Sequence, residues 1–500
     1  MTTTDAVWAD LTSRWQDLAD LNGTLALLNW DQSTYLPPAA AGGRARQKAL
    51  LSGIRHARAT DDAYGRLLDA AAARTDLSPE QARMVEVARK DFERATRFPS
   101  AFVQARSRHF GESYSAWTQA RPGNDFARMI PYLEKSLDLN VQAAGYFPEF
   151  ADPMDYFVDQ SDEGMTAAQV DAVFGELRAA LVPLADSVIA AGPPRTDFLN
   201  RHYPAQAQLR FGEDVIRQYG YDFAQGRQDL THHPFMTRLG ERDTRITTRV
   251  KEHDPIDALY STLHEAGHAL YEQNVREDFL GTPLGGGVSA GVHESSSRMW
   301  ENLVGRSREF WAAYFGDLRD TFPDALGDVT EEEMYRASNV VSRSLIRVDA
   351  DELTYNLHVI TRYGLERDLL SGRLAVADLA DAWHAAYESN LGQRAPSDVD
   401  GVLQDVHWFA GGPGGAFQGY TLGNVLSAQF FAAAEAANPG LKGDFARRDF
   451  SRLLGWMREN VYRHGRMLRP AEMVVQATGQ PMNVEPYLAY LRGKYGALLG

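Results

Sequence analysis

The stretch STLHEAGHALYEQ, residues 261–273, places two histidines four positions apart, with a glutamate directly after the first. Asp254 and Pro255 precede it and form a typical helix start, because aspartate caps free backbone amides and proline fits the first helical position. Apolar residues then recur with the spacing of an α-helix, so we expect one amphipathic helix here. Its apolar face would carry Ile256, Leu259, Tyr260, Leu263, Gly267, Leu270 and Tyr271.

The two histidines, His264 and His268, would project side by side from adjacent turns of this helix. Two imidazole rings at this spacing can hold one small cation, and Glu265 can then reach a metal-bound water as a general base. The alternative is a surface helix with two unrelated histidines. Ala266 and Gly267 keep the helix slim, which would let a second segment pack close to it.

A metal site needs a third ligand, and two candidates stand where a glycine-rich loop leads into a new helix. They are His293 and Glu294. A carboxylate would complete the set of two histidines and one glutamate that catalytic zinc sites use, with a fourth position left for water. Arg298 and Glu301 lie further along the same helical face, so they are candidates to orient the ligand. The alternative is a solvated helix start, where the helix dipole favours a glutamate.

The composition excludes several classes of protein. The 500 residues include 51 basic and 67 acidic side chains, a net charge of −16, which argues against nucleic acid or an anionic membrane as a partner. The chain has no cysteine, so histidines and carboxylates must hold any metal. No stretch approaches about 18 uninterrupted apolar residues, so we expect no membrane span. The N-terminus does not read as a signal peptide, and we expect a cytoplasmic protein.

Helical spacing dominates the rest of the chain, and we find no internal repeat or linker. We therefore predict a mostly α fold in which residues 1–500 form one large catalytic domain. Strands are expected only at residues 245–250 and 286–292, and the one compositionally unusual loop is Gly411–Gly415. The predicted helical runs are 5–30, 43–73, 78–120 with a break near Pro99, 166–191, a capped run from Thr330 toward Leu370, and three helices within 445–499.

Ordered motifs along the whole chain resemble those of the carboxypeptidase Taq family of metallocarboxypeptidases. The matching stretches are Trp30-Asp31 with Leu36-Pro37-Pro38, His233-Pro234-Phe235, Asp243–Thr247, His264–His268, His293–Asn302, Ile346–Asp351 and Gly401–Gly423. There is one departure. The family's G-Y-F-P-T-Y stretch corresponds to Gly415–Tyr420, in which Ala416 replaces the first tyrosine and the preceding glycine loop has one extra residue. Loop shape and substrate preference are the properties that this change affects.

The resemblance implies a helical fold with a deep substrate groove and a gluzincin-like H-E-x-x-H helix at its floor, beside a few short strands. It implies that Glu294 is the third metal ligand, and that each chain binds one divalent metal, zinc or cobalt. It also implies a homodimer that releases single residues, with broad specificity, from the C-termini of peptides. A zinc oligopeptidase or dipeptidase with the same metal site is the alternative, and a non-catalytic scaffold that binds metal or peptides is a further one.

Residues inside the matched motifs are candidates for the remaining roles. Arg347, expected on a helix, or Arg245 would bind the terminal carboxylate of the substrate, because the guanidinium fork pairs bidentately with carboxylates. For Arg347 the alternative is a structural ion pair with Asp349 or Asp351. For Arg245 the predicted strand would bind the peptide by main-chain pairing, or the arginine is a plain edge-strand charge.

Two further side chains are candidates to donate hydrogen bonds to the oxyanion that forms on the scissile carbonyl. They are Tyr420, which lies just beyond the glycine loop, and His233. His407 would orient either of these two groups, and it counts with Arg347 and Arg245 among the candidate substrate-binding residues. The alternative for each is an ordinary structural role, such as a buried aromatic ring or the cap of a turn.

Overall fold

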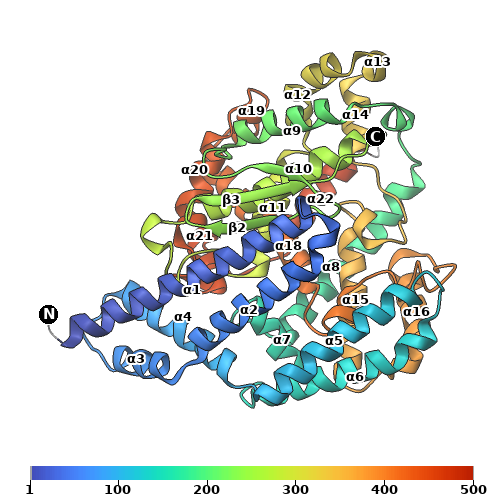
Figure 1. Ribbon diagram of the computed structural model, residues 1–500. Coiled ribbons are helices and arrows are strands. Elements are labelled where there is room, and N and C mark those ends of the chain that lie inside the picture. The colour runs from blue at the N-terminus through green and yellow to red at the C-terminus, as the bar shows by residue number, and fades with distance from the viewer. Residues whose placement is uncertain (1–2, 499–500) are drawn as a thin grey trace.

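The structure is a computed structural model that describes residues 3–498. Helices make up most of it, so the predicted mostly α fold is confirmed (Figure 1). The α-helices are α1 (Thr3–Thr34), α2 (Ala41–Thr60), α3 (Asp62–Ala72), α4 (Pro79–Thr96), α5 (Ser100–Ala120), α6 (Phe126–Gly145), α7 (Pro153–Ser161), α8 (Ala167–Ala190), α9 (Ala205–Tyr219), α10 (Pro255–Gln273), α11 (Ala290–Arg298), α12 (Arg308–Thr321), α13 (Pro323–Leu326), α14 (Glu331–Ser338), α15 (Tyr355–Leu370), α16 (Leu379–Leu391), α17 (His407–Ala410), α18 (Gln418–Ala437), α19 (Leu441–Phe445), α20 (Ser451–Asn460), α21 (Pro470–Thr478) and α22 (Glu485–Leu498).

The strands form one small sheet of β1 (Gln228–Leu230), β2 (Met236–Gly240) and β3 (Asp243–Thr248) in the order β1-β3-β2. β3 is parallel to β1 and antiparallel to β2, and it corresponds to the strand predicted at 245–250. The strand predicted at 286–292 is wrong. Residues 286–289 form a loop, and α11 begins at Ala290 because the Ser289 side chain accepts a hydrogen bond from the Val292 amide and caps the helix.

Two predicted helical runs are interrupted, and one of them is divided by a side chain that caps a new helix. The run at 43–73 divides at Asp61, which accepts a hydrogen bond from the Tyr64 amide at the start of α3. The capping box at Thr330 is confirmed, but the run toward Leu370 is not one helix, since α14 ends at Ser338 and α15 begins at Tyr355. Asp351 accepts from the Thr354 amide in the intervening segment. The last predicted run extended to residue 499, which lies outside the described residues.

Three helices meet tightly at the centre of the molecule, beside the sheet (Figure 1). A Cβ atom on Gly267 of α10 would lie 2.6 Å from the Ser297 Cα of α11, so only glycine permits this approach. Similarly, a Cβ atom on Gly423 of α18 would lie 2.5 Å from the Glu294 Cβ of α11. The expectation that Gly267 lets a second segment pack close is confirmed.

A π-helical turn, η4 (Met299–Val304), continues directly from α11. Such turns have i→i+5 hydrogen bonds and occur often at functional sites. This one carries Glu301. None of the helices within residues 3–498 is long and apolar enough to cross a membrane.

Candidate metal centre

The side chains of α10 and α11 bring three potential metal ligands together. His264, His268 and Glu294 each offer one ligand atom, and these atoms all lie within 4.8 Å of one another. The Glu294 Oε2 atom is 3.8 Å from the His264 Nε2 atom and 3.3 Å from the His268 Nε2 atom. Ligands at tetrahedral positions around zinc, with bonds of about 2.0–2.1 Å, are about 3.3 Å apart. The arrangement therefore fits a small divalent metal.

Two of the ligands are oriented by the residues that sequence reasoning had placed beside them. The His264 Nδ1 atom is 2.9 Å from Glu301 Oε2, so its N–H donates to that carboxylate. Arg298 donates to Glu294 Oε1 over 2.6 Å and to Glu301 Oε2 over 3.2 Å. Burial raises the pKa values of both glutamates, but Arg298 and the histidines outweigh it, so the pKa of Glu301 falls to about 2 and that of Glu294 lies well below its usual range. Both carboxylates are therefore ionised at neutral pH.

His293, the other candidate for the third ligand, is directed elsewhere. Its Nδ1 atom lies 2.6 Å from His268 Nδ1 and its Nε2 atom lies 3.0 Å from Glu272 Oε1. Both ring nitrogens are therefore engaged away from the position between His264 and Glu294.

Glu265 is buried beside the ligands, with only 7% of its surface exposed. Burial raises its pKa to about 7, and the charge of Glu294 adds to the rise, whereas His264 and the backbone amide of Met236 lower it. It is not one of the three clustered ligands. A buried carboxylate with a pKa near neutrality, on which the charges of His264 and Glu294 act, has the properties of a general base.

Tyr420 and His233 lie in very different surroundings. Tyr420, on α18, packs against the Tyr355 ring at 6.3 Å between centroids, and burial raises its pKa to about 12, with Glu294 among the charges that act on it. It is therefore protonated and able to donate. His233 is exposed in the turn between β1 and β2, and no hydrogen bond within residues 3–498 joins it to the other candidates.

Arg347 is in the short 3-10 helix η5 (Arg347–Asp349), not on a long helix as expected. Its buried guanidinium donates to Asp405 through Nε and Nη2, each over 2.9 Å, so the predicted alternative partners Asp349 and Asp351 are wrong. Asp405 also accepts from Arg362 and lies 3.0 Å from His407 Nδ1. The Nη1 atom of Arg347 donates to the hydroxyl of Tyr355.

Tyr355 links the arginine network to the metal ligands, and sequence reasoning missed it. Its ring lies 4.7 Å from the guanidinium of Arg298, the arginine that holds Glu294, and its hydroxyl contacts Arg347. The only sequence signal was its place four residues after the matched stretch that ends at Asp351. Asp405 had a clearer signal, because it lies inside a matched motif.

Arg245 is held by its own strand. It forms two hydrogen bonds with Asp243 and lies 4.4 Å from the Trp30 ring of α1. β3 is the central strand, with β1 and β2 on its two sides, so the expectation that this strand pairs with a peptide is wrong. The outer strand β2 is the one that comes close to Glu265, through the Met236 amide.

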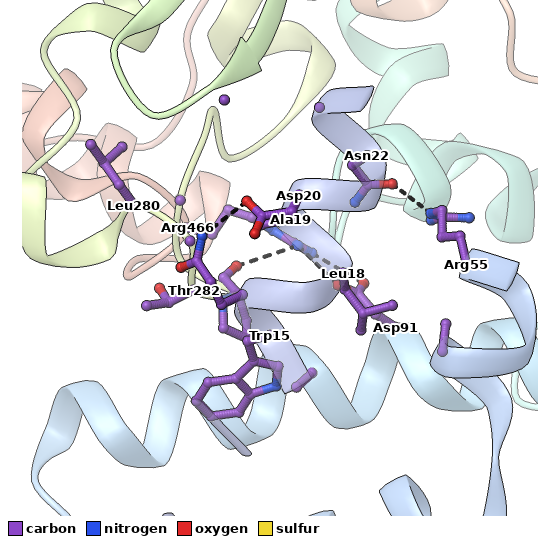
Figure 2. Close-up of a pocket in the computed structure, with 18 of the residues that line it drawn as sticks. Trp15, Leu18, Ala19, Asp20, Asn22, Arg55, Asp91, Leu280, Thr282 and Arg466 are labelled. Carbon is purple, nitrogen blue, oxygen red and sulfur yellow. Dashed lines mark hydrogen bonds and ion pairs between the residues drawn. The ribbon is translucent and has the colours of Figure 1, made fainter. Parts of the chain in front are cut away.

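A cavity of about 310 Å³ lies between α1, α2, α4 and the loop 280–285 (Figure 2). Trp15, Leu280 and Thr282 line it, and Arg466 pairs with Asp91 at its wall. None of the three clustered candidate ligands lines this cavity, so the candidate metal centre is not located there. Arg238 of β2 also lines it, and this residue reaches Glu272 behind the metal centre.

Comparison with known proteins gives one consistent result. A model of the carboxypeptidase Taq (M32) metallopeptidase family matches residues 10–495. The chain is 41% identical to thermostable carboxypeptidase 1 of Thermus thermophilus, with 100% of both chains covered, and 36% identical to carboxypeptidase 1 of Bacillus subtilis, with 95% of both covered. The crystal structure of M32 carboxypeptidase from Deinococcus radiodurans R1 is 74% identical, covers 99% of this chain and 100% of its own, and superposes with a TM-score of 0.98.

Proposed function

Because the chain belongs to the carboxypeptidase Taq (M32) metallopeptidase family and is a metallocarboxypeptidase, we propose that His264, His268 and Glu294 bind its metal and that Glu265 is its general base. The observation that carries this proposal is the convergence of the three ligand atoms within 4.8 Å, with Glu265 buried next to them. Two imidazoles and one carboxylate are the donor set of hydrolytic zinc sites, and we propose one zinc ion per chain, with cobalt as an alternative.

The proposed chemistry is hydrolysis of the C-terminal peptide bond. When bound, the metal lowers the pKa of a coordinated water toward about 7 and polarises the scissile carbonyl. Glu265 takes the proton of the attacking water and passes it to the leaving amine. Tyr420, protonated and close to Glu294, donates a hydrogen bond to the oxyanion, and His233 is the second candidate for that role.

We propose that Arg347 anchors the free carboxylate that distinguishes a peptide end. Asp405 would fix the plane of its guanidinium, His407 would hold Asp405 from the other side, and Nη1 with the Tyr355 hydroxyl would meet the substrate. Arg245 is the alternative anchor. An anchor that binds the end of the main chain, and not a side chain, agrees with broad specificity.

The resemblance to the family also supports two further proposals, a homodimer and a cytoplasmic location. Light scattering on the purified protein would test the first, because a monomer and a dimer of a 55.6 kDa chain differ twofold in mass.

A digest of one peptide, combined with mass spectrometry, tests the proposed function. With added zinc or cobalt, we expect a ladder of products that differ by one C-terminal residue, and a chelator should stop it. The same peptide with an amidated C-terminus should resist. Internal cleavage would instead favour an oligopeptidase, release of residue pairs a dipeptidase, and an intact peptide the non-catalytic scaffold.

A further inference from the structure

His268 is held differently from its neighbour His264. The ring of His264 donates directly to a carboxylate, that of Glu301. The corresponding nitrogen of His268 meets another histidine, His293, at 2.6 Å, and only behind that ring stands a carboxylate, Glu272. His264 therefore contacts a carboxylate directly, whereas His268 is connected to one only through the ring of His293.

The metal position determines the direction of the hydrogen bonds. A neutral imidazole that binds metal through Nε2 carries its proton on Nδ1, so His268 donates to the Nδ1 atom of His293. His293 must then carry its own proton on Nε2, and it donates to Glu272 over 3.0 Å. Each ring is thus fixed in one tautomer by the next group along a relay that runs from His268 through His293 to Glu272.

Neighbouring residues hold both His293 and Glu272 in place. The ring of His293 stacks on that of Tyr271, with centroids 5.1 Å apart. A Cβ atom on Gly287 would lie 2.3 Å from His293 Cδ2, so the ring occupies the space that a side chain would need. The Gly287 amide donates to Glu272 Oε1 over 3.0 Å.

The far end of the relay is Arg238. Its Nη1 atom lies 3.3 Å from Glu272 Oε2, an ion-pair contact without hydrogen-bond geometry, and its Nη2 atom donates to the carbonyl of Gly285 over 3.4 Å. Glu272 itself is only 9% exposed, and a buried charge needs partners. Arg238 and the two donors on Oε1, the Gly287 amide and His293 Nε2, compensate its charge.

We infer that His293 and Glu272 are positioning residues for His268: they hold its ring in the orientation and tautomer that the metal requires, and so set the metal affinity of the site. This inference rests on the proposed function, in which His268 is a ligand. Partners that orient a metal ligand typically change metal affinity by about 10- to 100-fold when they are removed. Because the support acts through the ligand, its loss is visible in metal binding before any substrate is added.

The experiment measures the zinc dissociation constant of the full chain by competition with a chelating dye. We expect His293→Gln and Glu272→Ala each to raise it by about 10- to 100-fold. His293→Asn should raise it less than His293→Gln, because its Oδ1 atom can take the place of Nδ1 and accept from His268. The double variant Glu272→Ala/His293→Gln should be no worse than the weaker-binding single variant, since both changes break one relay.

Two controls separate the possible failures. His109→Gln removes a half-buried histidine of α5 that hydrogen bonds to Ser136, and it should leave zinc affinity unchanged. His268→Ala should nearly abolish binding, and if it does not, the proposed ligand set is wrong. If His268→Ala abolishes binding while His293→Gln and Glu272→Ala bind zinc as the wild type does, the relay alone is overturned. Should Glu272→Ala fail to fold, the comparison of His293→Asn with His293→Gln decides, and equal affinities would contradict the relay.

Discussion

At the scale of single residues, Glu265 and Glu294 are both buried glutamates of one site, but their surroundings move their pKa values in opposite directions. Burial raises the pKa of Glu265 to about 7. Glu294 is as buried, but Arg298 and the histidines outweigh that burial, and its pKa lies well below the usual range. One carboxylate is thus suited to accept a proton and the other to remain an anion that binds metal.

Glu265→Gln should separate these two roles. The variant keeps the shape of the side chain and all three proposed ligands, so we expect zinc content close to that of the wild type. It cannot accept the proton of the attacking water, so kcat should fall by at least about 10²- to 10⁴-fold, the usual contribution of a general base. Metal analysis and turnover are measured on the same sample. A variant that holds zinc and turns over at the wild-type rate would show that Glu265 is not the base.

Arg347→Ala tests the proposed carboxylate anchor. Loss of one charge-assisted contact is worth roughly 2–4 kcal/mol, so kcat/KM for free-acid peptides should fall by about 30- to 1000-fold. The poor rate on amidated peptides should barely change, because the amide never had that contact. The variant also removes one partner of Asp405. If this damaged the fold, the rates on free-acid and on amidated peptides would fall together. Equal losses would make Arg347 structural and Arg245 the next candidate.

The residues predicted from sequence and those found only in the structure differ in one physical respect. His264, Glu265 and His268 share one helix, so helical geometry alone determines their relative positions. The partnership of Arg347 with Asp405 joins positions 58 residues apart and depends on tertiary packing. For the same reason the sequence suggested Asp349 and Asp351, which are close in the chain, as the partners.

At the scale of elements, the proposed metal centre depends on how closely α10 and α11 approach. The predicted start of α10 at Asp254 and Pro255 is confirmed, because a helix cap is a local property. The strand predicted over residues 286–292 is wrong, because the glycine-rich stretch Gly286-Gly287-Val288-Ser289 forms a loop. At Gly287 a Cβ atom would lie 2.3 Å from His293 Cδ2, a close contact that the sequence pattern does not reveal.

Gly267→Ala should force these two helices apart. The added methyl group would lie 2.6 Å from Ser297 Cα and 2.9 Å from Ser296 O, and backbone atoms cannot move aside cheaply. Overpacking of this kind costs about 1–3 kcal/mol, and we expect weaker zinc binding as well, because Glu294 lies on the displaced helix. Denaturant unfolding and zinc titration measure the two effects.

Gly53→Ala is the matched control, since Gly53 lies in α2 with open space around it. It should stabilise the protein by about 0.4–1 kcal/mol through the unfolded chain. If Gly267→Ala behaved like Gly53→Ala, close approach of α10 and α11 would not be required for stability.

At the scale of the whole molecule, stability and pH are coupled through a buried carboxylate remote from the proposed ligands in sequence. Glu366 of α15 is fully buried and accepts from Trp408 Nε1 over 2.8 Å and from the Gly415 amide over 3.0 Å. It therefore ties the glycine loop that precedes Tyr420 to the helical core. Burial raises its pKa to about 7, although Trp408 and the loop amides act to lower it.

A raised carboxyl pKa makes the folded state less stable as pH rises. Below the ordinary pKa of 4.5 Glu366 is protonated in both states and contributes nothing, whereas above about 7 it is ionised in both and the folded state bears the cost. The shift corresponds to about 3 kcal/mol. Glu366→Gln removes this dependence, so its free energy of unfolding, relative to that of the wild type, should rise between about pH 4.5 and 7. Urea unfolding at several pH values measures the difference, and parallel curves for the two proteins would contradict the assignment.

In the π-helical turn η4, the number of residues affects the proposed site more than their identity does. Glu301 lies within this turn and reaches His264, while Arg298 and Glu294 lie on the α-helical turns before it. Deletion of Met299 or Trp300, which lie between the two glutamates, would bring Glu301 one position closer to Glu294 and rotate it by about 100° around the helix axis. Glu294 and Glu301 could not then both keep their places. Substitution of one residue within this segment preserves the spacing between Glu294 and Glu301, whereas deletion of a residue between them changes it.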